Sequence, residues 1–239
     1  AYVSVGAQDS ARAERELLIA FARRVHELGA DRLRVADTVG VLNPFQTQAL
    51  FKELTAALPE LELAFHAHDD LGMATANTLA AFEGGAAAAD VTVAGIGERA
   101  GNAALEQVAM AVPNLGVRNR ALYPLCATVL RAAGLRPPKS APIIGENVFS
   151  HESGIHVSAV LNHRAAYEPF SAADVGRSDS TRVVLGVHSG EAALRHALNE
   201  AGINPCGEPL GWLLNRVRDH ALKTKKPITP RQLRNLFYD

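Results

Sequence analysis

Two histidines two positions apart, His66 and His68, are the residues of this sequence with the clearest potential for chemistry. They end the apolar run that begins at Leu61, which predicts a strand, and alternate residues of a strand point to the same side. Both imidazoles can therefore face one point, as the ligands of a catalytic divalent metal do. A histidine pair at a strand end also commonly serves only to satisfy hydrogen bonds, so the neighbouring residues decide the interpretation.

The polar neighbours of the two histidines lie at two predicted strand exits. Asp69 and Asp70 follow the histidines directly. A second apolar run, 91–93, leads into a loop that carries Glu98 and Asn102. In proteins built of repeated strand–helix units, the loops that follow the strands form the active-site face. The two clusters together predict a metal-dependent active site.

The bulk composition narrows the class of protein. A net charge of -1 over 239 residues gives no drive toward nucleic acid or anionic membranes. No apolar run approaches the ~20 residues that span a bilayer. The two cysteines, Cys126 and Cys206, form no Cys-x-x-Cys motif, which is typical of a reducing compartment. We therefore expect a cytoplasmic protein without nucleic-acid or membrane partners.

Four strand–helix units are predicted between residues 2 and 113. The expected strands are 2–5, 33–36, 61–65 and 91–93, and a helix follows each of them. This alternation predicts a parallel sheet with right-handed crossovers. A complete eight-unit barrel typically needs ~250 residues. We therefore expect an α/β fold in which residues 1–115 are the second half of a (β/α)8 TIM barrel, from its fifth strand to its eighth helix.

The rest of the chain is expected to be an appendage to this half barrel. Residues 116–142 are predicted to be a helix and a Pro-rich linker, and residues 143–239 a small post-barrel region with a helical C-terminus. Two or three amphipathic helices are expected in that terminus, including one at 210–222 and a final one at 231–237 that is capped by Thr229. Because the chain starts on a strand without an initiator Met, we expect it to be cut from a longer protein.

Several segments resemble the family of homocitrate synthases and isopropylmalate synthases. The two longest are HAHDDLGMATANTLAA (66–81) and GIGERAGNAALE (95–106). Shorter ones occur in family order: DSAR (9–12), ADTVG (36–40), HESGIH (151–156) and LGVHSG (185–190). Within the family, the chain is most similar to the nitrogen-fixation type of homocitrate synthase. The resemblance implies a metal-dependent acyltransferase on a TIM barrel, which condenses acetyl-CoA with a 2-oxo acid.

The resemblance also implies roles for individual residues of the barrel part. His66, His68 and Asn102 would bind a divalent cation, Mg, Mn or Zn. Arg12 and Thr38 would contact the 2-oxo acid. Glu98 would be a catalytic carboxylate that acts on the acetyl group or orients water. Without the resemblance, Glu98 is also interpretable as one member of a surface ion pair with Arg99, and Arg12 as a surface residue at a helix start.

Two further catalytic residues are implied in the post-barrel region. His156 and Tyr167 match the acid/base pair of the family. Because this region reaches into the neighbouring subunit's barrel in the family, the resemblance implies a domain-swapped homodimer. The identity of the base stays open between Glu98, His156 and an acid that this sequence lacks.

The departures from the family pattern keep alternative functions open. The first-strand Asp-Arg-Glu-type motif, which supplies a further metal ligand, is absent. Gln8, Ala94 and Val187 stand where Glu, Asn and Lys are common. The predicted function is condensation of acetyl-CoA with 2-oxoglutarate to give homocitrate and CoA. The alternatives are an isopropylmalate or citramalate synthase acting on another 2-oxo acid, a lyase of the same family, or a non-catalytic fragment.

Overall fold

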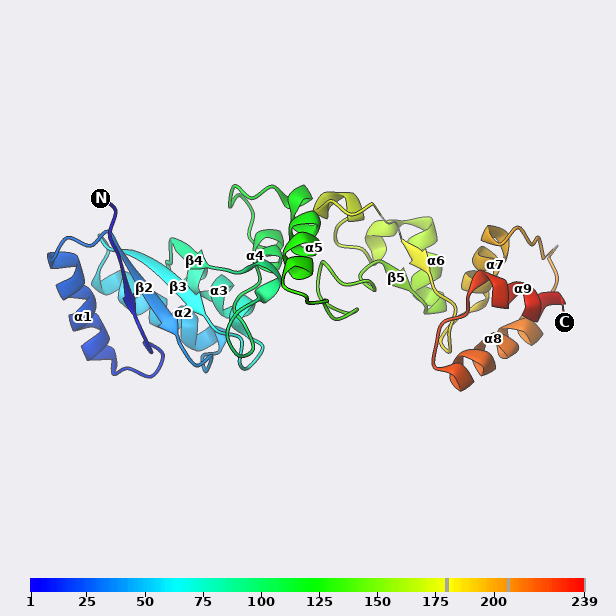
Figure 1. Cartoon of the computed structure of the whole chain (residues 1–239), viewed down its shortest axis with the longest axis horizontal. Coiled ribbons are helices and arrows are strands. Elements are labelled where there is room, and N and C mark those ends of the chain that lie inside the picture. The colour runs from blue at the N-terminus through cyan, green and yellow to red at the C-terminus, as the bar shows by residue number, and fades with distance from the viewer. Residues whose placement is uncertain (179–180, 206, 239) are drawn as a thin grey trace. The chain divides into compact units, whose positions relative to one another are not determined.

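The computed structural model describes residues 1–178, 181–205 and 207–238. The chain divides into two compact units, Ala1–Pro137 and Pro138–Asp239 (Figure 1). The division lies inside the Pro-rich stretch of the sequence. In the described part of the chain, no helix combines the length and the apolar character needed to cross a membrane.

The first unit alternates strands and helices, as the sequence predicts. Its strands are β1 (Ser4–Ala7), β2 (Arg32–Asp37), β3 (Glu62–Ala67) and β4 (Ala88–Asp90). Its α-helices are α1 (Arg15–Glu27), α2 (Pro44–Ala57), α3 (Ala74–Glu83), α4 (Leu105–Ala111) and α5 (Leu122–Ala132), with 3-10 turns η1 (Val93–Gly95) and η2 (Asn119–Ala121).

The four strands form one parallel sheet in the order β1-β2-β3-β4. This confirms the prediction of an α/β fold with a parallel sheet. Over the described residues the sheet is open and does not close into a barrel. Its assignment as half of a barrel stays a prediction.

Two strands differ from their predicted positions. The strand expected at 91–93 was wrong, because Val93–Gly95 is a 3-10 turn and β4 lies earlier, at Ala88–Asp90. The alanines of β4 give no strand signal of their own, and the strand is set by its pairing with β3, in which His66 is the partner of Asp90. β1 likewise continues through Gly6, which we expected to begin the loop.

The two faces of the sheet differ in chemistry. One face packs against the helices and is apolar, with Leu33, Val35, Leu63 and Phe65 in the buried core. The rings of Phe51 on α2 and Phe65 meet edge to face, with centroids 5.3 Å apart. The alternate residues of the same strands carry charge. They are Arg32, Arg34, Glu62, His66 and Asp90, joined by Arg32–Glu62, Arg34–Asp90 and His66–Asp90 ion pairs.

This charged face is unusual for a parallel sheet, whose strands are ordinarily apolar on both faces. The charged side chains of this face are paired with one another and remain 31–46% exposed, so this face is not packed like the apolar one. The candidate site lies on the same side.

The second unit is mainly helical. Its strands are β5 (Ser150–His151) and β6 (Arg182–Val183), which pair in parallel. Its helices are α6 (Gly154–Asn162), α7 (Glu191–Glu200), α8 (Gly211–Thr224) and α9 (Pro230–Tyr238), with 3-10 turns η3 (Arg164–Ala166) and η4 (Ala172–Val175). α8 and α9 confirm the two helices predicted at the C-terminus. The hydroxyl of Thr229 accepts from the Gln232 amide at 3.3 Å, which confirms the predicted cap.

Candidate active site

A cavity of about 410 Å³ lies at the carboxyl ends of β1, β2 and β3. Its lining consists of Gly6, Ala7, Gln8, Arg34, Ala36, Thr38, His66, His68, Glu98 and Arg99. Four of the predicted site residues are therefore brought together from three separate parts of the chain. They are His66 near the end of β3, His68 just after it, Thr38 after β2, and Glu98 in the loop that follows η1.

The two imidazoles lie side by side in this cavity, with ring centroids 5.1 Å apart and ring planes at 69°. His66 Nδ1 is 3.0 Å from Asp90 Oδ2. The same Asp90 oxygen accepts a hydrogen bond from Arg34 Nη1 at 3.2 Å. The Asp90 carboxylate on β4 therefore orients the His66 ring through Nδ1. This contact does not involve the other ring nitrogen, Nε2.

His68 carries an unsatisfied buried nitrogen. Its Nδ1 atom is buried and has no hydrogen-bond partner. Burial lowers the pKa of His68, and the positive charge of Arg99 and the neighbouring His66 lower it further. A lowered pKa favours the neutral imidazole of His68, which is the form that binds a metal ion. The residues present fit part of a divalent-cation site, since the two imidazoles can supply nitrogen donors.

A complete set of metal ligands is not found in the described part of the chain. No group of three or more His, Cys, Asp or Glu side chains there is placed to hold a metal ion.

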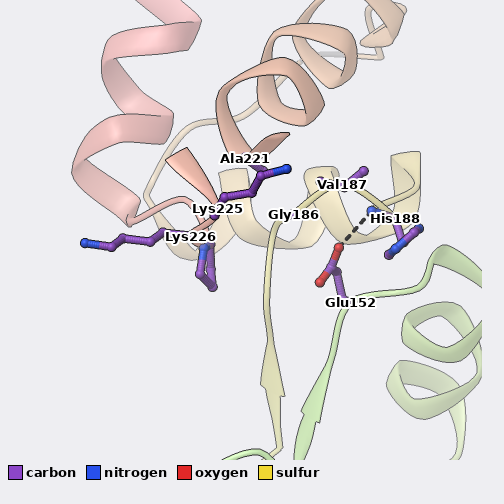
Figure 2. Close-up of a pocket in the computed structure, with 8 residues that line it drawn as sticks. Glu152, Gly186, Val187, His188, Ala221, Lys225 and Lys226 are labelled. Carbon is purple, nitrogen blue, oxygen red and sulfur yellow. Dashed lines mark hydrogen bonds between the residues drawn. The ribbon is translucent and has the colours of Figure 1, made fainter. Parts of the chain in front are cut away.

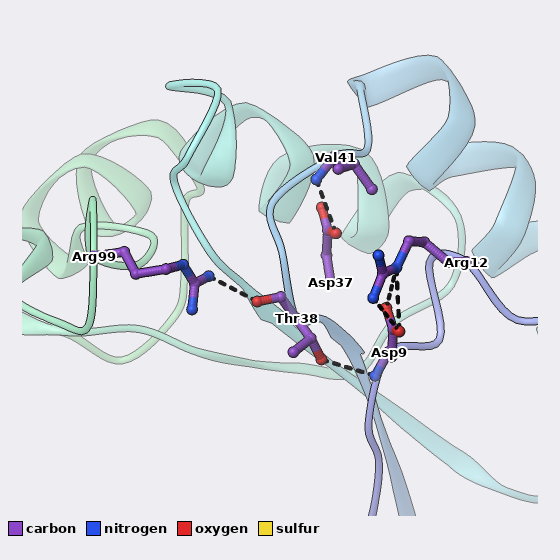
Figure 3. A network of polar contacts seen from close by, with 6 residues as sticks. All are labelled: Asp9, Arg12, Asp37, Thr38, Val41 and Arg99. Carbon is purple, nitrogen blue, oxygen red and sulfur yellow. Dashed lines mark hydrogen bonds and ion pairs between the residues drawn. The ribbon is translucent and has the colours of Figure 1, made fainter.

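Arg99 connects the loop after η1 to the exits of β2 and β3 (Figure 3). Its guanidinium donates to both carboxylate oxygens of Asp70, at 2.8 and 2.9 Å, and to the Thr38 carbonyl at 2.7 Å. The hydrogen bond from Arg99 lowers the pKa of Asp70. Arg99 thus pairs with Asp70, while the negative charge of Glu98 also acts on the Arg99 guanidinium and helps to raise its pKa. Gly40 permits this close approach, since its φ is +62° and a Cβ atom there would lie 2.8 Å from Asp70 Oδ2.

Thr38 is held in the cavity from two sides. Its Oγ1 accepts from the Asp9 amide at 2.7 Å. The preceding residue, Asp37, is fully buried and accepts from the amides of Val41 and Leu42, each at 3.0 Å (Figure 3). Asp37 therefore shapes the loop, while Thr38 presents its side chain to the cavity.

Arg12, the second predicted substrate contact, does not line the cavity. Its guanidinium donates to the carboxylate of Asp9, with the shortest contact at 2.6 Å, and lowers the pKa of that carboxyl. The Arg12 side chain remains 59% exposed. A role in binding the 2-oxo acid stays a prediction for Arg12 and requires release from Asp9.

Asn102 lies next to the histidines along the backbone but faces a different cavity. It forms an isolated bridge with His68, and its side-chain amide donates to the Ala67 carbonyl at 3.0 Å. It lines a smaller cavity of about 160 Å³ together with Asp69 and Thr75. Its role as a metal ligand stays a prediction.

In the second unit, His156 on α6 and Tyr167 stack on each other. Their ring centroids are 4.1 Å apart and the planes are inclined by 31°. A buried pair braces the segments around them, because His151 Nε2 lies 3.1 Å from Glu168 Oε1 and Thr181 donates to the same oxygen at 2.7 Å. Sequence reasoning did not single out this buried pair.

The LGVHSG segment lines a separate cavity of about 260 Å³ in the second unit (Figure 2). Glu152 Oε1 accepts from the His188 amide at 2.7 Å. Val187, which stands where lysine is common, shares this cavity with Lys225 and Lys226. The cavity thus contains lysine side chains although position 187 does not supply one.

The sequence did not single out Arg34, which lines the first cavity, or Asp90, which bonds to Arg34 and His66. The alternation of the strand predicted at 33–36 could have placed Arg34 on the side of Thr38. Asp90 had no such signal, because its strand was predicted at the wrong residues.

Comparisons with known proteins place the chain in a family. Residues 1–128 match the HMGL-like family, and the chain belongs to that family. Residues 143–225 match a second family, described as homocitrate synthase post-HMGL domain-like. This second match lies within the second compact unit.

The curated relatives are synthases of three kinds. The 2-isopropylmalate synthase 2 of Caldanaerobacter subterraneus subsp. tengcongensis is 43% identical, over 100% of this chain and 62% of the relative. Homocitrate synthase 1 of Nostoc sp. is 42% identical, over 98% of this chain and 63% of the relative. The (R)-citramalate synthase CimA of Methanocaldococcus jannaschii is 41% identical, over 91% and 45%. The chain thus spans about three fifths of the length of the first two relatives.

Proposed function

We propose that this chain carries the metal-binding half of an acyltransferase that condenses acetyl-CoA with 2-oxoglutarate, giving homocitrate and CoA. One observation carries the proposal: two imidazoles, a threonine and a carboxylate line one cavity at the carboxyl ends of parallel strands. That edge is where α/β proteins of this type hold their reacting groups. The names of the relatives support an acyl-CoA condensing activity, since they include homocitrate, isopropylmalate and citramalate synthases.

In this proposal His66 and His68 hold a divalent cation, with Asn102 as a weaker ligand. A bound cation would supply Lewis acidity, which polarises a carbonyl oxygen. The chain prepares its two histidines for this task in different ways. Asp90 orients His66 through Nδ1, and burial favours the neutral form of His68, which has a free nitrogen.

The remaining residues bind substrate or move protons. Thr38 offers a hydroxyl to the 2-oxo acid, with its Oγ1 already anchored by the Asp9 amide. Glu98 is the carboxylate that lines the cavity, and in this proposal it accepts a proton or orients water. His156 and Tyr167 form the acid/base pair in the second unit. A domain-swapped homodimer, in which this pair serves the partner's cavity, is part of the same proposal.

Two alternatives follow from particular observations. Identity to isopropylmalate and citramalate synthases is as high as identity to homocitrate synthases, which favours a different 2-oxo acid within the same reaction. The lack of a three-residue acid, histidine or cysteine cluster in the described residues favours a chain that cannot condense anything alone.

The test is an assay of thiol release from acetyl-CoA with several 2-oxo acids in the presence of Mn²⁺. The chain is assayed alone and fused to the segment of the Nostoc relative that it does not match. We expect release only from the fusion, and the fastest release with 2-oxoglutarate. Faster release with pyruvate or 2-oxoisovalerate would select the alternative synthases. No release from a folded fusion, as judged by circular dichroism, would contradict the proposed function.

A further inference from the structure

Arg34 lies on β2 and lines the first cavity. It stands two residues before Ala36 and four residues before Thr38 in the sequence, and both of these also line the cavity. Alternate residues of a strand point to one side, so these three residues share the charged face of the sheet. In the register of the sheet, Ala36 is the partner of His66. Arg34 therefore lies deeper in the cavity than the imidazoles, by about 7 Å or two strand residues.

In the part of the chain that the structure describes, only one nitrogen atom of the Arg34 guanidinium donates a hydrogen bond. Its Nη1 atom pairs with Asp90 Oδ2 at 3.2 Å, and Asp90 is shared with His66. The Nε and Nη2 atoms have no hydrogen-bond partner among the described residues. These two atoms form the edge that grips a carboxylate with two parallel hydrogen bonds.

Gly6 keeps that free edge accessible. A Cβ atom at position 6 would lie 3.4 Å from Arg34 Nη2 and 3.7 Å from Nε. Any larger side chain on β1 would therefore cover the edge. Because Gly6 has no side chain, the space next to Arg34 is part of the cavity. Gly6 and Arg34 both line that cavity.

The other arginines near the cavity are already engaged. Arg99 lines the cavity, but it gives hydrogen bonds to both oxygens of Asp70 and to the Thr38 carbonyl. Arg12 is bound by Asp9 and does not line the cavity. Arg34 is thus the cavity arginine that offers a free bidentate edge in the described part of the chain.

We propose that Arg34 binds the second carboxylate of a dicarboxylic 2-oxo acid and so selects 2-oxoglutarate over monocarboxylic 2-oxo acids. This inference rests on the proposed function, because it places the keto end of the acid at the two imidazoles. The carboxylate at Arg34 then belongs to the opposite end of the same extended molecule. A monocarboxylic acid has no second carboxylate, so it would not form the paired hydrogen bonds with Arg34 that a dicarboxylic acid forms.

The experiment measures binding to the 239-residue chain itself by saturation-transfer NMR, with diamagnetic Mg²⁺ present. The probes are 2-oxoglutarate and pyruvate, and the proteins are the unaltered chain, Arg34→Gln, Arg34→Lys and Arg32→Gln. Arg32 is the matched control, because it lies on the same face of β2, pairs with Glu62 and does not line the cavity.

We expect the unaltered chain and Arg32→Gln to prefer 2-oxoglutarate. Arg34→Gln should weaken 2-oxoglutarate by about 10- to 100-fold, the range for a hydrogen-bonded charged group, and leave pyruvate unchanged. Arg34→Lys keeps the positive charge but cannot form two parallel hydrogen bonds with a carboxylate. This variant should lose part of the preference for 2-oxoglutarate over pyruvate.

Two results would overturn the inference. One is equal binding of both acids by the unaltered chain, and the other is an undiminished preference in Arg34→Gln. Binding of neither acid would also overturn it for this chain. The condensation assay decides the proposed function separately, because release with a monocarboxylic 2-oxo acid would uphold that function while the role of Arg34 fails.

Discussion

His66 Nδ1 lies 3.0 Å from Asp90 Oδ2, so a carboxylate on β4 sets the orientation of an imidazole on β3. Carboxylates in this position orient ligating histidines and raise their basicity. We expect Asp90→Asn to weaken Mn²⁺ binding by about 10- to 100-fold, measured as free Mn²⁺ by electron paramagnetic resonance. Glu62→Gln is the control, since Glu62 lies on the same face of the sheet and pairs with Arg32. Equal affinities for the two variants would contradict the role assigned to Asp90.

Ala94 is held in the left-handed region of backbone conformation, with φ of 56°. This conformation disfavours a Cβ-bearing residue and suits glycine or asparagine. We expect Ala94→Gly to raise the free energy of unfolding by about 0.5–1 kcal/mol, with the entropy of the unfolded glycine already subtracted. The same change at Ala76, an exposed position inside α3, should lower it by about 0.5–1 kcal/mol. Hydrogen exchange of the β3 amides measures the free energy of unfolding of each variant. If both substitutions changed that free energy in the same direction, the backbone explanation would be refuted.

Cys126 is buried on α5, and its thiol donates to the buried Glu106 carboxylate at 3.5 Å. Burial, followed by the charge of Glu106, raises the pKa of Cys126 from 9.0 to about 12. The unfolded chain loses this proton near pH 9, whereas the folded chain keeps it to about pH 12. The contribution of Cys126 is therefore fully present below pH 9 and is lost as the pH rises from 9 toward 12.

The corresponding test compares the unaltered chain with Cys126→Ser at pH 8 and pH 10.5. Urea unfolding followed by circular dichroism should show the smaller loss in the variant. The difference should approach about 1.4 kcal/mol per pH unit above the unfolded pKa. Parallel losses in the two proteins would mean that Cys126 ionises in the folded state as it does in the unfolded one.

Much of the cavity could be predicted because its residues follow strands with strong apolar patterns. Apolar residues alternate in the runs before Thr38 and before His66, and parallel strands bring their exits to one edge. β4 was misplaced, since two alanines carry no strand preference. Asp90 was missed for the same reason.

Contacts between distant residues lay beyond the sequence pattern. Two ion pairs depend on side-chain positions that only the folded loops define. They are the pair between Arg12 and Asp9 and the bidentate pair between Arg99 and Asp70. The orientation of Asn102 away from the imidazole cavity has the same origin, because a hydrogen bond to the Ala67 carbonyl fixes its amide.

The central claim is that His66 and His68 form a metal-dependent condensation site, and one substitution tests it most directly. His66→Ala is introduced into the fusion with the Nostoc segment, and thiol release is followed with acetyl-CoA, 2-oxoglutarate and Mn²⁺. His26→Ala is the control, since His26 is an exposed histidine in the last turn of α1. We predict that release falls to background in His66→Ala, with an unchanged circular dichroism spectrum, and is retained in His26→Ala. Full release from a folded His66→Ala protein would contradict the assignment of the metal site.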